Sequence, residues 1–153
     1  MLILGAGACG FNIEDQVIGK KSLFPIAEQA GRIAAARDGA RAAGVEAFIN
    51  ARTDVFLQNA AADHDKLVDD AIARGRAYHE AGADGLFVPG LTSLELIALL
   101  CRELPIPINV MILPNLPERA QLAEAGVARI SYGFAPMQGM MRALKAAAKE
   151  ALQ

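Results

Sequence analysis

Short apolar runs alternate with longer helical patterns along the whole chain. The runs cover residues 10–13, 47–50, 85–88, 106–112 and 128–132, and four of them follow an Ala-Gly pair. Each run is unbroken and bounded by polar or turn residues, which is typical of strands buried on both faces of a parallel sheet. Glycine is favoured just past the end of a helix, so the Ala-Gly pairs predict that a helix ends before each of these four strands.

The segments between the runs repeat apolar residues at helical spacing. We expect helices over residues 26–43, 63–81, from about 92, 117–125 and about 137–152. Asp63 is a candidate N-cap, Thr92 and Glu95 have the spacing of a capping box, and Pro117 suits a first helical turn. The pattern therefore repeats a strand followed by a helix five times.

This alternation predicts an α/β fold with parallel strands and right-handed crossovers. Either an open doubly wound sheet or part of a (β/α)₈ TIM barrel fits it. A barrel unit takes about 31 residues. The 153 residues would then supply about five units, and we expect residues 1–153 to form a single partial TIM-barrel domain.

Composition narrows the classes of function. The chain has 15 Lys and Arg against 17 Asp and Glu, a net charge of −2, and 54% of its residues are hydrophobic. A nucleic-acid-binding protein usually carries clustered basic residues, and a disordered one has few apolar residues. No apolar run is long enough to cross a membrane, and residues 1–4 lack the basic start of a signal peptide. Two cysteines, Cys9 and Cys101, indicate a reducing compartment, and we expect a cytoplasmic protein.

Residues 5–10 match the dinucleotide-binding pattern G-x-G-x-x-G. That pattern binds a pyrophosphate only where a helix begins at once. Here residues 11–13 have the character of a strand, and the acidic residues Glu14 and Asp15 follow. We therefore interpret the segment as a helix end followed by a strand.

Polar residues gather where the predicted strands end. They are Asn12, Glu14, Arg52, Asp54, Asn109 and Ser131. Both candidate folds place the active site at the carboxyl ends of the strands. Carboxylates on one strand and an arginine on the next could hold a hard cation such as Mg²⁺ and an anionic substrate. The alternative is that Arg52 and Asp54 pair with neighbours and only stabilise the rim.

Residues outside the strand ends carry weaker signals. Lys20, Lys21 and Ser22 follow the first strand, where a loop could close over an anion or simply be solvated. His64 and His79 are expected on helix surfaces. The methionines of the last helix are expected to pack against the rest of the chain.

Three segments carry a resemblance to a known family. Residues 10–16 (GFNIEDQ), 48–54 (FINARTD) and 81–91 (AGADGLFVPGL) resemble the isocitrate lyase/phosphoenolpyruvate mutase superfamily, and residues 109–111 and 126–131 continue it. The resemblance implies a (β/α)₈ barrel of which this chain supplies strands four to eight, without the first three units. It also implies Mg²⁺ and a small 2-oxo or 2-hydroxy carboxylic acid, whose C–C or P–C bond is made or broken through an enolate-like state.

The resemblance assigns roles to individual residues. Glu14 would help to hold Mg²⁺, Arg52 would bind the anionic group of the substrate, and Asn12 and Asn109 would be further substrate contacts. Lys20 would match a lysine of the gating loop, and Ser22 stands where the lyases carry a catalytic cysteine. A serine hydroxyl is a far weaker proton donor than a thiol.

A further difference concerns Gly90, which stands where the lyases tend to carry a glutamate. Cleavage of isocitrate or methylisocitrate is therefore disfavoured. Two hypotheses remain: a Mg²⁺-dependent lyase or mutase represented by part of its barrel, and a catalytically inactive partial barrel that associates with itself. An open sheet leaves two unpaired edges, and family members exchange their last helix, so a homo-oligomer is expected.

Overall fold

Five parallel strands form one sheet in chain order. The computed structural model describes residues 2–152. The strands are β1 (Gly10–Glu14), β2 (Phe48–Arg52), β3 (Gly85–Phe87), β4 (Ile108–Met111) and β5 (Arg129–Ser131), and each pairs in parallel with the next. The predicted order of strands and helices along the chain is confirmed. Strands β3, β4 and β5 are each shorter than the apolar run from which they were predicted.

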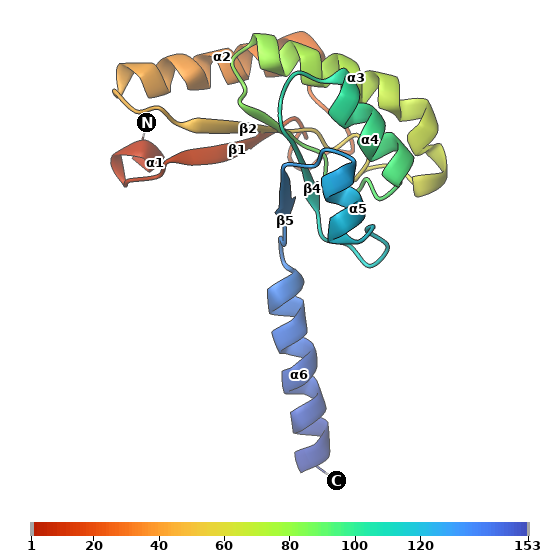
Figure 1. Cartoon of the computed structure of the whole chain (residues 1–153). Coiled ribbons are helices and arrows are strands. Elements are labelled where there is room, and N and C mark those ends of the chain that lie inside the picture. Colours follow the sequence, from red (N-terminus) through yellow and green to blue (C-terminus); the bar gives the residue numbers. More distant parts are fainter. Residues whose placement is uncertain (1, 153) are drawn as a thin grey trace.

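A helix follows each strand, and the helices other than α6 lie on one side of the sheet (Figure 1). They are α1 (Leu2–Gly5), α2 (Ile26–Ala42), α3 (His64–Glu80), α4 (Leu94–Glu103), α5 (Arg119–Glu124) and α6 (Ala135–Ala151), with a 3₁₀ turn at Ala61–Asp63. A doubly wound sheet would carry helices on both faces and a reversal of strand order. Consecutive parallel strands with helices on one side are the arrangement of a TIM barrel, so the chain forms a partial barrel.

Side chains alternate between the two faces of the sheet, as the strand period of two requires. Ile49, Leu86, Ile108 and Val110 face the helices and are fully buried in the main core. The intervening residues face the inside of the partial barrel, where Asn12, Arg52 and Asn109 stand among the described residues. One face of the sheet therefore supplies the core and the other supplies polar groups.

The ends of the elements differ in detail from the expectations. Gly10 begins β1 and α1 ends at Gly5, so no helix starts at the glycine-rich segment, as predicted. Ser93, rather than Thr92, caps α4 by accepting a hydrogen bond from the Leu96 amide at 3.4 Å. Asp63 stands at the N-cap of α3, but its carboxylate pairs with Lys66.

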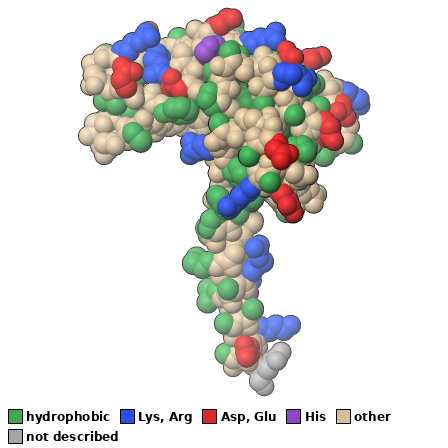
Figure 2. Space-filling model, viewed as in Figure 1, with side chains coloured by type: hydrophobic (Ala, Val, Ile, Leu, Met, Phe, Trp, Pro, Cys, Tyr) green, Lys and Arg blue, Asp and Glu red, His purple; other side chains and the backbone are tan. Residues whose placement is uncertain are grey.

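The last helix α6 projects away from the rest of the molecule (Figure 1). None of its residues is buried, and apolar side chains line it in the space-filling view (Figure 2). Those of Met137, Met140 and Leu144 are each about 60% exposed (58%, 62% and 60%). The prediction that these methionines pack against the chain is wrong, because the helix leaves the body of the fold. In the described part of the chain, no helix is long and apolar enough to span a membrane.

Candidate active site

The ends of β1 and β2 bring Glu14 and Arg52 together. The two residues are direct partners in the parallel register, and their side chains form an ion pair of 3.2 Å. The guanidinium also binds both carboxylate oxygens of Asp54, at 2.6 Å from Nε and 2.9 Å from Nη2. The expected convergence of an acid and a guanidinium on one rim is thus present in the structure.

Arg52 stays charged in this setting. Its burial opposes the charge, but the hydrogen bonds and the negative charges of Asp54 and Glu14 outweigh burial and raise the pKa of Arg52 above its ordinary value. Two guanidinium N–H groups, at Nε and Nη2, donate to Asp54, and Nη1 forms the ion pair with Glu14, so N–H groups that make no hydrogen bond remain for a ligand. The pairing of Arg52 with Asp54 and the capacity to bind an anion therefore coexist.

A buried network fixes Asp54. Its backbone amide donates to the Asp15 carboxylate at 2.9 Å, and both aspartates are fully buried. Asp15 also accepts hydrogen bonds from the Tyr78 hydroxyl at 2.9 Å and from Arg74 at 3.1 Å. Burial and the Asp15 charge raise the pKa of Tyr78 far above its ordinary value. Helix α3 thereby holds the ends of β1 and β2 in place. The sequence indicates Asp15 only as part of a strand-end motif, and no local pattern predicts this network.

The asparagine side chains on the inner face of the sheet form hydrogen bonds with side chains of the neighbouring strands. Asn50 donates to the Asn12 side-chain oxygen at 2.8 Å, which links β2 to β1. Asn109 and the Ser131 hydroxyl exchange two hydrogen bonds of 3.0 and 3.1 Å, which link β4 to β5. These pairs fix polar side chains inside the partial barrel.

A hollow of about 790 Å³ lies next to Arg52. Asn12, Arg52, Arg129 and Ser131 form its polar part, and the remainder of its wall is mainly apolar. A cavity of this size accommodates a small organic acid. We refer to it as the Arg52 hollow.

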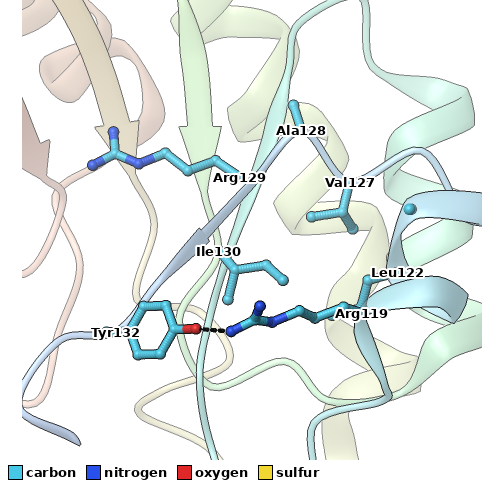
Figure 3. Close-up of a pocket in the computed structure, with 8 residues that line it drawn as sticks. Arg119, Leu122, Val127, Ala128, Arg129, Ile130 and Tyr132 are labelled. Atoms are coloured by element: carbon cyan, nitrogen blue, oxygen red, sulfur yellow. Dashed lines mark hydrogen bonds between the residues drawn. The ribbon is translucent and has the colours of Figure 1, made fainter. Parts of the chain in front are cut away.

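Arg129 is a candidate site residue that was not predicted from the sequence. It is the register partner of Asn109 and lines the Arg52 hollow, and it forms no ion pair with any described residue. Arg129 is also part of the lining of a smaller hollow with Arg119, Leu122, Val127 and Ile130, but Figure 3 shows its side chain extending away from those residues. Its position two residues before Ser131 could have indicated the shared face.

Comparisons with known proteins identify the family. The family model for phosphoenolpyruvate phosphomutase matches residues 2–152. The chain belongs to the phosphoenolpyruvate mutase/isocitrate lyase superfamily. It is 50% identical to the crystal structure of a putative phosphonomutase from Burkholderia cenocepacia, with a TM-score of 0.93 over 97% of this chain and 60% of that chain.

Other members of the superfamily have different reactions in their names. Oxaloacetate decarboxylase from Bradyrhizobium sp. (strain BTAi1) is 32% identical over 91% of this chain and 48% of its own length. The crystal structure of 2,3-dimethylmalate lyase is 28% identical, with a TM-score of 0.81 over 95% of this chain and 51% of that chain. The chain spans about half the length of the curated relatives it matches.

The expected gating loop of this superfamily member is a small hairpin. Val17 donates its backbone amide to the Ser22 carbonyl at 2.9 Å, and an isolated bridge joins Gln16 to Leu23. Lys20 and Ser22 are exposed. Within the described residues, their side chains form no hydrogen bond or ion pair, and neither lines the Arg52 hollow. The structure therefore does not bring Lys20 and Ser22 to Glu14 and Arg52.

Of the two histidines, only His79 is on the surface. His79 is exposed as expected, but His64 is buried, with 4% of its surface accessible. Its Nε2 lies 3.0 Å from the Phe56 carbonyl oxygen, and its ring packs edge-on against Phe56. The prediction of a surface position for His64 is wrong, because a backbone carbonyl satisfies the buried ring.

The residues that could hold Mg²⁺ do not form a complete site by themselves. Residues 2–152 contain no group of three or more Asp, Glu, His or Cys side chains placed to hold a metal ion. The carboxylates of Asp15 and Asp54 are fully buried and bound by the network, and Glu14 is paired with Arg52. Mg²⁺ prefers an octahedral shell of oxygen ligands, which Glu14 alone does not provide.

Proposed function

We propose that this chain carries the Arg52 half of the active site of a carbon–carbon (or phosphorus–carbon) lyase that acts on a small 2-oxo or 2-hydroxy carboxylic acid. The observation that supports this most strongly is the Glu14–Arg52–Asp54 group at the carboxyl ends of neighbouring strands. In barrels of this kind, catalytic residues stand at that end of the strands. The oxaloacetate decarboxylase and phosphonomutase relatives support the same class of reaction.

In this proposal, Arg52 binds the anionic group of the substrate. The guanidinium N–H groups that do not bind Asp54 form charge-assisted hydrogen bonds, and the positive charge of Arg52 stabilises the negative charge that develops on an enolate oxygen. Asp54 fixes the guanidinium so that little reorganisation is needed as the charge develops. Asn12 lines the Arg52 hollow as a further substrate contact. Asn109, the other expected contact, is buried and bonded to Ser131, so in this proposal it acts by holding Ser131 in the wall of the hollow.

The proposal also gives roles to the gating loop and to Mg²⁺. Lys20 would neutralise negative charge and Ser22 would contribute a hydroxyl once the loop closes over the hollow. Mg²⁺ is expected for a complete barrel, in which Glu14 would supply one oxygen ligand and other segments the rest. We also propose a cytoplasmic location, from the cysteine usage.

Self-association without catalysis is the second candidate function. It is favoured by the exposed apolar side chains of α6 and by the unpaired outer edges of β1 and β5 among the described residues. Exposed apolar surface of this extent typically marks an interaction site. A second copy of the chain is the proposed partner.

Pyruvate release from oxaloacetate in the presence of Mg²⁺ distinguishes the two candidates. Mg²⁺ alone decarboxylates oxaloacetate slowly, so the rate is compared with a protein-free control. We expect a rate above the control that falls at least tenfold in Arg52→Gln and is unchanged in Arg41→Gln, a matched control on an exposed arginine of α2. A rate equal to the protein-free control, in an associated protein, would favour the inactive partial barrel.

A further inference from the structure

Most polar side chains around the Arg52 hollow already form hydrogen bonds with neighbouring side chains. The Ser131 hydroxyl both donates to and accepts from Asn109, and the Asn12 oxygen is taken by Asn50. The Tyr132 hydroxyl binds Arg119. Because the Tyr132 hydroxyl accepts from Arg119, its O–H remains a donor, and the other side-chain donors left for a ligand are two guanidinium groups and the Asn12 amide nitrogen. The side-chain oxygens on this wall that can accept are those of Asn12, Ser131 and Tyr132, and each already accepts one hydrogen bond.

The rest of the wall is apolar. It is formed by Leu57, Phe87, Met111, Leu113 and Phe134, from the ends of β3 and β4 and from the segments after β2, β4 and β5. Phe87 and Met111 are buried, whereas Leu57 and Phe134 remain 44% and 54% exposed. The Phe87 ring lies beneath Arg52, with the guanidinium carbon 5.9 Å from the ring centre. An anion-binding group thus adjoins a continuous apolar surface.

We propose that this hollow selects acids with an anionic head for Arg52 and an alkyl-substituted body, in preference to acids that carry additional hydroxyl groups. The inference rests on the proposed function, because it assumes that Arg52 binds the substrate's anionic group. Each methylene placed on the apolar wall is removed from water, which favours binding. A hydroxyl placed against these apolar side chains loses its bonds to water and finds no oxygen or nitrogen partner among them, which disfavours binding.

Binding of 2-substituted malonates to the intact chain tests this proposal, because they keep two carboxylates constant while the substituent changes. We expect affinity, measured by NMR titration, to rise about two- to fourfold per methylene from malonate through methyl-, ethyl- and propylmalonate. Hydroxymalonate, which is close in size to methylmalonate, should bind at least about threefold more weakly than methylmalonate.

Substitutions in the apolar wall test whether that wall causes the rise in affinity along the alkyl series. Leu57→Asn and Phe134→Ser, at half-exposed positions that tolerate polar residues, should flatten the alkyl series and leave the affinity for malonate unchanged. Leu2→Asn, at a leucine that is 93% exposed and remote from the hollow, should leave the whole series unchanged. Arg52→Gln should weaken every member of the series by a similar factor.

The outcomes separate this inference from the proposed function. Equal affinities along the alkyl series, with a loss in Arg52→Gln, would overturn the alkyl preference and leave the role of Arg52 intact. An alkyl series that Arg52→Gln does not weaken would overturn both, because the head group would then bind elsewhere. Absence of measurable binding by any malonate would also overturn both.

Discussion

The Asp15 carboxylate accepts a 2.9 Å hydrogen bond from the backbone amide of Asp54, which lies 39 residues later in the chain. This bond joins the end of β1 to the turn after β2. It orients the Asp54 carboxylate, and that carboxylate holds Arg52 through two hydrogen bonds. The position of the Arg52 guanidinium, which is the candidate substrate-binding group, thus depends on Asp15. Asp15 is fully buried and does not line the Arg52 hollow.

Removing the Asp54 charge should destabilise the fold. Asp54→Asn replaces a buried carboxylate that carries a bidentate charge-assisted pair, and we expect a loss of about 1.5–3 kcal/mol in the free energy of unfolding, measured by urea denaturation. Asp38→Asn removes a surface pair with Arg41 whose side chains are more than 70% exposed, and should change stability by less than about 0.5 kcal/mol. Equal effects of the two substitutions would contradict the structural role of Asp54.

Tyr78 should make the free energy of unfolding depend on pH at alkaline pH. The pKa of Tyr78 is raised in the folded chain, so above about pH 10, the unfolded value, the unfolded state has lost a proton that the folded state keeps. Stability should therefore fall as the pH rises above 10. Tyr78→Phe should lower stability by about 1–3 kcal/mol at neutral pH, because Asp15 loses a donor, and should make the alkaline decline less steep.

Denaturation curves between pH 7 and pH 11 check this, with Tyr132→Phe as the control. Tyr132 is 44% exposed, and its substitution should leave the slope of stability against pH close to that of the unsubstituted chain. The same slope in Tyr78→Phe as in the unsubstituted chain would rule out a raised Tyr78 pKa as its source.

Replacing Gly90 by a residue with a side chain should destabilise the fold. Its φ is +94°, and a Cβ at this position would lie 2.6 Å from the Leu57 backbone nitrogen. We expect Gly90→Ala and Gly90→Glu to destabilise by at least about 1–3 kcal/mol, so the glutamate of the lyases could not be introduced here without moving the segment after β2. Gly31→Ala, inside α2 with nothing near its Cβ, should instead stabilise by about 0.5–1 kcal/mol. Thermal melting of the three variants measures both effects.

Helix α6 should drive self-association. Met140→Glu with Leu144→Glu places charges on its exposed apolar side, and sedimentation velocity should show the association of the unsubstituted chain lost in this double variant. Lys145→Glu on the same helix is the control, because it changes the charge without removing apolar surface. A monomer at all concentrations of the unsubstituted chain would contradict the proposed oligomer.

The repeating pattern of the sequence was sufficient to predict the strands and their order along the chain, but it left both a doubly wound sheet and a partial barrel open. Ala-Gly pairs mark where helices end, and unbroken apolar runs mark buried strands, so both signals are local. The alignment of Glu14 with Arg52 followed from parallel pairing of strands that end in polar residues. These features depend on spacing within one strand–helix unit or between neighbouring units.

The features that the sequence did not predict depend on distant contacts. Asp15 meets Arg74 and Tyr78 across 59 and 63 residues, and no local pattern indicates that distance. His64 is buried because a backbone carbonyl, which no sequence pattern reveals, lies beside its ring. The exposure of α6 was missed because its apolar spacing is the same whether a helix packs on its own chain or on a partner.

The anion-binding role of Arg52 is tested most directly by titrating the chain with oxalate, whose planar pair of oxygens resembles the enolate of pyruvate, and measuring affinity by calorimetry. Loss of a charge-assisted pair corresponds to about 1.5–3 kcal/mol, so we expect Arg52→Gln to bind oxalate at least about tenfold more weakly than the unsubstituted chain. Equal affinities of the two proteins for oxalate would contradict the role assigned to Arg52.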